Sequence, residues 1–271
     1  MDRIKYIEAY CDKKRIGDNS IIYALIRCLD ETDIVRLLQK SFTKNLLLRH
    51  ASLKIVIEHC SESWKTLYND LIEYIIKVFP NLPPNCKSTP IYCLGELAVY
   101  APQTSRATVL EFLLSSRYAA ERRKGLNIIK AHEISTFRDA IDKCAFGHRE
   151  PKAALIIIQH FTPEYIHEKR ADIMDILDAG WAVGRLYLRA AEHNPQCIEE
   201  LRSVDGVTFA YVKAKLNEIL PEDELMALVK EYRFDDRFGL LVWSIGKMKY
   251  WKVLEYIVEH HNEWKAEKTL F

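Results

Sequence analysis

Apolar residues recur three to four positions apart along most of this chain, and short polar stretches separate the recurrences. This spacing places the apolar side chains on one face of a helix. From residue 89 onward the pattern predicts helices at about 89–100, 104–116, 118–132, 136–145, 150–160, 163–177, 181–193, 195–203, 207–219, 222–232, 236–249 and 251–267. Alternation with a period of two does not extend over any useful length, so we expect essentially no sheet.

The first part of the chain predicts helices of the same kind. Ser20 is a suitable N-cap for a helix over 21–29, and later helices are expected at 32–41, 43–57 and 64–79. The strongest interruption is the proline-rich loop at 80–90. Proline removes a backbone donor and disfavours the helical conformation of the residue before it, so the chain must leave the helix there.

One short motif recurs through these helices: a leucine that follows a small residue in the second helix of a pair. It occurs at intervals of about thirty residues, apart from a longer gap across the proline-rich loop, and its positions are Leu25, Leu53, Leu94, Leu126, Leu155, Leu186 and Leu240, with Val212 as a weaker candidate. A small residue before the leucine lets the helix approach its neighbour closely. The exceptions are Arg185 and Tyr211, which stand where the other copies have a small residue.

Three copies carry a basic residue ahead of the small one: Arg123-Lys124-Gly125-Leu126, Lys152-Ala153-Ala154-Leu155 and Arg237-Phe238-Gly239-Leu240. This pattern resembles the second helix of HEAT-like repeats, and Asp235-Asp236-Arg237 is similar to the turn that leads into it. The resemblance implies an all-α, right-handed α-solenoid of about seven or eight helical pairs over 1–271, with a capping helix at 251–267. In a solenoid the second helices line a continuous concave face.

Composition narrows the classes of function. The 39 basic and 38 acidic residues nearly cancel, so no whole-molecule field attracts nucleic acid or a membrane. The seven cysteines are scattered without a Cys-x-x-Cys pair, which is typical of reduced thiols in a cytoplasmic protein and not of a structural zinc site. The chain shows no signal-peptide pattern and no apolar run of membrane-spanning length, so we expect a cytoplasmic protein without a membrane partner.

The second helices carry the candidate binding residues. The best candidates are the basic residues Arg122, Arg123, Lys124, Lys152, Arg185 and Arg237 and the aromatic anchors Trp181 and Trp243. The basic ones belong to a longer ridge on the same helices that also includes Arg49, Arg149, Arg189 and Lys247. The competing interpretation, which we favour for the group, is that the arginines join neighbouring repeats and the tryptophans belong to the core. The residues from Arg122 to Lys124 are the best exception, because three consecutive charges cannot all point the same way.

Catalytic motifs are missing from the sequence. It contains no Gly-x-Ser-x-Gly, phosphate-binding loop, dinucleotide fingerprint or His-Glu-x-x-His. The histidines at 59, 132, 160 and 193 close successive helices, where a donor or cation interacts favourably with unpaired carbonyls. We therefore predict no catalytic residue, no metal and no cofactor.

These observations predict a non-catalytic scaffold or adaptor whose concave face binds a protein or peptide. The alternative is a nucleic-acid-binding HEAT-like protein, which could be an enzyme similar to the alkylpurine DNA glycosylases. Some HEAT-like solenoids are glycosylases of this kind, and they hold DNA on a basic concave face. Asp178 precedes Trp181 here, but the Trp-Asp pairing of those enzymes is absent. The two hypotheses differ in salt dependence, which is steep when phosphates are bound.

Overall fold

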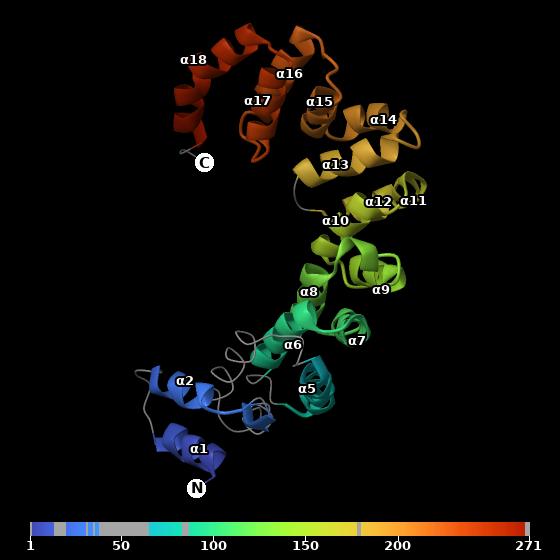
Figure 1. The fold of residues 1–271 in the computed structure, drawn as a ribbon. Coiled ribbons are helices and arrows are strands. Elements are labelled where there is room, and N and C mark those ends of the chain that lie inside the picture. The colour runs from blue at the N-terminus through green and yellow to red at the C-terminus, as the bar shows by residue number, and fades with distance from the viewer. Residues whose placement is uncertain are drawn as a thin grey trace. The chain divides into compact units, whose positions relative to one another are not determined.

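The computed structural model describes residues 2–13, 20–30, 32–34, 36–37, 65–82, 87–177 and 180–268, which form helices and no strand (Figure 1). The expectation of an all-α chain without a sheet is therefore confirmed for the described residues. They divide into two compact units, Met1–Ala140 (unit 1) and Ile141–Phe271 (unit 2). The short helix α9 (Arg138–Asp142) spans the boundary.

Unit 1 contains the described helices α1 (Arg3–Lys13), α2 (Ser20–Arg27), α5 (Lys65–Val78), α6 (Ser88–Tyr100), α7 (Gln103–Leu114) and α8 (Ala119–Ile128). A continuous apolar core runs through it, from Ile4 and Ile22 to Leu71, Leu94 and Leu113. The proline-rich loop is shorter than predicted, since Phe79–Asn81 is a 3-10 turn and α6 begins at Ser88. The predicted helices over 43–57 and most of 32–41 lie outside the described residues.

A buried ion pair joins neighbouring segments near the C-terminal end of unit 1. Arg106 and Glu133 are 4% and 6% exposed, and the guanidinium donates two hydrogen bonds to the carboxylate. Arg106 also donates to the carbonyl oxygens of Ala98, at 2.7 Å, and of Ile128. Burial alone raises the pKa of Glu133, but hydrogen bonds from Arg106 and from the Lys130 backbone outweigh it, so the pKa lies below its ordinary value.

Unit 2 contains a row of four helices that pack one on the next: α10 (Pro151–His160), α13 (Gly180–Ala191), α15 (Gly206–Lys215) and α17 (Phe238–Lys247). We call these four the central row. The flanking helices pack against members of the row, and they are α11 (Pro163–Glu168), α12 (Arg170–Met174), α14 (Cys197–Val204), α16 (Glu222–Tyr232) and α18 (Trp251–Lys268). Figure 1 shows α13, α15 and α17 following one another in this order.

Local chemistry explains where several helices begin and end. The Asp205 carboxylate accepts the Thr208 N–H at 3.1 Å and caps α15. Lys249, just after α17, has a φ of 66°, and the Tyr250 N–H donates to the Ile245 carbonyl at 3.2 Å. This is a Schellman-type C-cap, in which one residue after the helix adopts the left-handed conformation. The predicted helix over 163–177 is two helices, because the chain breaks at Lys169 between α11 and α12.

The small-residue motif packs as expected at some positions and differently at others. A Cβ on Gly125 would lie 3.0 Å from the Leu114 side chain, so α8 approaches α7 closely there. Gly239, in contrast, has no neighbour within 4 Å of such a Cβ. The motif therefore marks a close helix contact in unit 1 and an open helix surface in α17.

Candidate binding surface

The central row of unit 2 contains basic residues and no acidic residue within the bounds of its four helices. The basic residues are Lys152, Arg185, Arg189, Lys213, Lys215 and Lys247. Each flanking α-helix, from α11 and α12 through α14 and α16 to α18, contains at least one carboxylate. Positive charge is thus concentrated on one row of packed helices although the whole chain is nearly neutral.

Two of the six cations bind carbonyl or carboxylate oxygens of unit 2. Arg189 donates to the carbonyl oxygens of Ile158 and Phe161, at 3.3 and 3.1 Å. Lys213 lies 2.7 Å from Glu199 and 2.8 Å from Glu218. Partial burial alone lowers the pKa of Lys213, but the hydrogen bonds to both carboxylates raise it above its ordinary value. These two cations stabilise the helix packing.

The other four are exposed: Lys152, Arg185, Lys215 and Lys247. None of them has a carboxylate partner among the described residues. An exposed cation without a partner keeps its full charge available for a ligand, whereas a paired cation must first lose its carboxylate. These four residues are therefore the cations of the row that an anionic partner can reach.

Two exposed tryptophans lie beside these cations. Trp181 is 44% exposed, and the Arg185 guanidinium lies 5.1 Å from the centre of its ring. Trp243 is 42% exposed, and the Lys215 ammonium lies 4.7 Å from the centre of its ring. Tyr211, which is buried and only 8% exposed, packs against the second pair, with the centre of its ring 5.4 Å from that of Trp243. Both arrangements are cation–π contacts, which hold the charged groups over the rings.

Gly184 connects the two groups across α13 and α15. A Cβ at this position would lie 2.5 Å from the Tyr211 ring, so only glycine lets that ring rest against α13. Gly184 is adjacent to Arg185 and one helical turn beyond Trp181. We call Trp181, Arg185, Tyr211, Lys215 and Trp243 together the aromatic–cationic surface.

A groove of about 630 Å³ lies between α10 and α13 at the edge of this surface. Leu155, Ile158 and Leu188 give it an aliphatic lining. Lys152, Arg185 and Trp181 border the same groove, so unpaired charge and apolar area occur side by side. Such a combination suits a ligand with both an apolar group and negative charge.

The predicted site residues fall in different settings. Lys152, Trp181, Arg185 and Trp243 all lie on the central row, and the first three border one groove. Arg237 stands at the N-cap position of α17, and its guanidinium donates hydrogen bonds to Asp235 and Asp205. The hydrogen bond to Asp235 and the charge of Asp205 raise the pKa of Arg237, and the same hydrogen bond lowers the pKa of Asp235.

The three consecutive charges of α8 lie in unit 1. Arg122 is 5% exposed and donates to the Ser116 carbonyl at 3.0 Å. Arg123 is exposed. Lys124 is half-buried, 3.1 Å from the Glu96 carboxylate and 5.0 Å from the centre of the Tyr92 ring. Only Arg123 therefore fits the expected solvent-facing cation.

Tyr211 and Lys215 were missing from the predicted site, although one of them left a signal. Arg185 and Tyr211 are the two exceptions to the small residue of the repeat motif. In the structure both belong to the aromatic–cationic surface. A departure from a packing rule marks a position under a different constraint, which is often functional.

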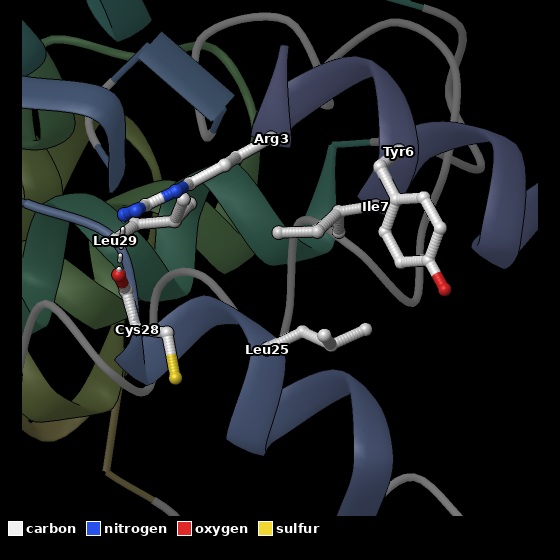
Figure 2. A pocket seen from close by; sticks show the side chains of 6 residues that line it. All are labelled: Arg3, Tyr6, Ile7, Leu25, Cys28 and Leu29. Atoms are coloured by element: carbon white, nitrogen blue, oxygen red, sulfur yellow. Dashed lines mark hydrogen bonds between the residues drawn. The ribbon is translucent and has the colours of Figure 1, made fainter. Parts of the chain in front are cut away.

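Unit 1 has an apolar pocket that the sequence did not indicate. Figure 2 shows its lining between α1 and α2, where Tyr6, Ile7 and Leu25 surround a cavity of about 410 Å³. Arg3, the charged group among the described residues of the lining, donates to the Cys28 carbonyl at 3.3 Å. The described part of the lining offers no carboxylate or imidazole for acid–base chemistry.

Groups for catalysis are scarce around the aromatic–cationic surface. The nearby carboxylates Asp205 and Asp235 are both bound by Arg237, and Asp178 lies outside the described residues. No group of three His, Cys, Asp or Glu residues that could hold a metal ion occurs in the part of the chain that the structure describes. Likewise, no described helix is long and apolar enough to cross a membrane.

Comparisons of this chain with known protein families, with curated proteins and with solved structures find no match.

Proposed function

We propose that this chain is a non-catalytic binding scaffold, and that the central row of unit 2 binds a protein or peptide. The observation that carries the proposal is the coincidence of two exposed tryptophans with four exposed cations that have no carboxylate partner among the described residues, on helices that contain no carboxylate. Exposed tryptophan beside arginine is typical of the residues that dominate binding energy at protein interfaces.

A HEAT-like solenoid is the architecture that we propose for the chain. It is supported by the motif spacing of about thirty residues and by the packing of α10, α13, α15 and α17 one on the next, with other helices flanking them. In such an architecture the central row corresponds to the concave layer. A cytoplasmic location belongs to the same proposal and rests on the scattered cysteines of the sequence.

Nucleic-acid binding is the second candidate function. The aromatic–cationic surface supports it, since single strands combine base stacking on aromatic rings with phosphate contacts to lysine and arginine. The charge of the whole chain speaks against it, because 39 basic and 38 acidic residues nearly cancel and no long-range field attracts a polyanion. A glycosylase would in addition need a carboxylate free to act, and Asp205 and Asp235 are both engaged by Arg237.

A display selection with random short peptides tests the proposal on the full chain. We expect the wild type to enrich a set of peptides that the Trp181→Ala/Trp243→Ala variant no longer retains. Trp251→Ala is the matched control, because Trp251 is 70% exposed on α18 and outside the central row. No enrichment by the wild type, or equal enrichment by the double variant, would contradict the proposed function.

A further inference from the structure

We infer that the partner of the central row is an acidic peptide segment with an aliphatic side chain that enters the groove between α10 and α13. This inference rests on the proposed function and specifies the chemistry of its partner. Three features of the molecule lead to it: the charge of the row, the position of Arg185 and Lys215 over the tryptophan rings, and the lining of the groove.

Charge complementarity sets the sign of the partner. Lys152, Arg185, Lys215 and Lys247 come from four helices that pack in sequence, so each helix of the row contributes one exposed cation. The four helices contribute no carboxylate that would repel an acidic residue or pair with a basic one. A neutral or basic segment would leave these cations without partners at the interface, which is unfavourable.

The two cations over the tryptophan rings favour carboxylates over nucleic-acid bases. Arg185 and Lys215 already cover one face each of Trp181 and Trp243. A base that stacked on that face would have to displace the cation. A carboxylate does not, because the N–H groups of a guanidinium held over a ring can donate to a carboxylate from its edge. The cation–π contact therefore holds Arg185 ready for an acidic side chain.

The groove selects an aliphatic side chain next to the acidic one. Leu155, Ile158 and Leu188 line the same space that Lys152 and Arg185 border. Burying a leucine or isoleucine side chain there gains the transfer free energy of its apolar surface. A phosphate backbone has no group that would use this lining. The partner is thus a peptide in which Asp or Glu lies close to Leu, Ile or Val.

Direct binding measurements on peptides from the selection test the inference. The most enriched peptide is compared with a version in which Asp and Glu become Asn and Gln, and with one in which its aliphatic residues become Ser. We expect both changes to weaken binding by about tenfold or more. The Lys152→Glu/Arg185→Glu variant loses the acidic peptide to a similar extent, whereas Lys252→Glu, an exposed lysine on α18, does not.

A charge exchange separates a lost contact from a misfolded protein. The Lys152→Glu/Arg185→Glu variant is expected to bind a peptide whose acidic residues are replaced by Lys better than the wild type does. If the wild type binds the Asn/Gln peptide as tightly as the acidic peptide, the inference is overturned and the proposed function still stands. An oligothymidine strand that binds more tightly than every peptide, and that the same variant loses, overturns both.

Discussion

Helix α8 in unit 1 and helix α13 in unit 2 both carry basic residues just before the leucine of the repeat motif, yet the surroundings of these residues differ. On α8, Arg122 is buried against the Ser116 carbonyl and Lys124 pairs with Glu96 of the neighbouring α6. On α13, Arg185 has the Trp181 ring as its neighbour and no carboxylate among the described residues. Contacts with nearby carboxylates and backbone carbonyls, and not the number of basic residues, decide which cations remain available to a partner.

The largest expected effect concerns the buried pair of unit 1. Arg106→Met leaves the Glu133 carboxylate buried without its main partner, and we expect a loss of about 3–5 kcal/mol in stability. Hydrogen exchange at the backbone amides of α7 and α8 measures this loss. The Arg106→Met/Glu133→Met variant should recover most of it, since no buried charge is left. Unchanged exchange in the single variant would show that the pair stabilises nothing.

A glycine in unit 2 tests the packing beneath the aromatic–cationic surface. Gly184→Val places a side chain where the Tyr211 ring lies, and we expect a loss of stability of about 1–3 kcal/mol together with weaker peptide binding. Gly246→Ala is the control, because a Cβ there meets nothing within 4 Å. Thermal unfolding followed by circular dichroism measures both. If Gly184→Val left stability and binding unchanged, Tyr211 would have to be placed differently.

Acid should weaken unit 1 through Glu133. The folded-state pKa of this carboxyl lies below its ordinary value of 4.5, so its contribution to stability is present above that value. The contribution is lost as the pH falls through the folded-state pKa, because protonation removes the partner of Arg106. Comparing wild type with Glu133→Gln by hydrogen exchange at α7 should show a difference at neutral pH that shrinks in acid. A difference that grew in acid would contradict this sign.

The smallest effects are expected at the exposed cations. Arg185→Gln should change the free energy of unfolding by no more than about 0.5 kcal/mol, as is usual for a surface substitution. Lys124→Gln removes the pair with Glu96, which is worth about 0–1 kcal/mol. Denaturant titration measures both values. A substantially larger loss at Arg185 would indicate that this arginine stabilises the fold and is not held for a partner.

Much of the fold could be predicted from the sequence, because helical periodicity is local. The predicted helix over 222–232 coincides with α16, and the one over 251–267 differs from α18 by one residue. The break at Lys169 could not be predicted, because the helical spacing of apolar residues continues through this position while the helical backbone conformation does not. The proposed solenoid and its repeat number stay predictions.

Part of the candidate site could be predicted as well. Lys152, Trp181, Arg185 and Trp243 were identified from their place in the repeated helix, and the structure puts all four on the central row. Whether a cation is paired depends on residues far away in sequence, such as Glu96 for Lys124 and Asp205 for Arg237. Tyr211 needed the contact with Gly184, which no single-helix pattern reveals.

Two double charge reversals, compared in one binding experiment, test the central claim most directly. Arg123→Glu/Lys124→Glu changes α8 of unit 1, and Lys152→Glu/Arg185→Glu changes the central row of unit 2. The dissociation constant of the selected acidic peptide is measured for each variant by fluorescence anisotropy. We predict that the unit 2 variant weakens binding by about tenfold or more while the unit 1 variant stays close to wild type. The opposite pattern would contradict the claim that the unpaired cations of the central row form the binding surface.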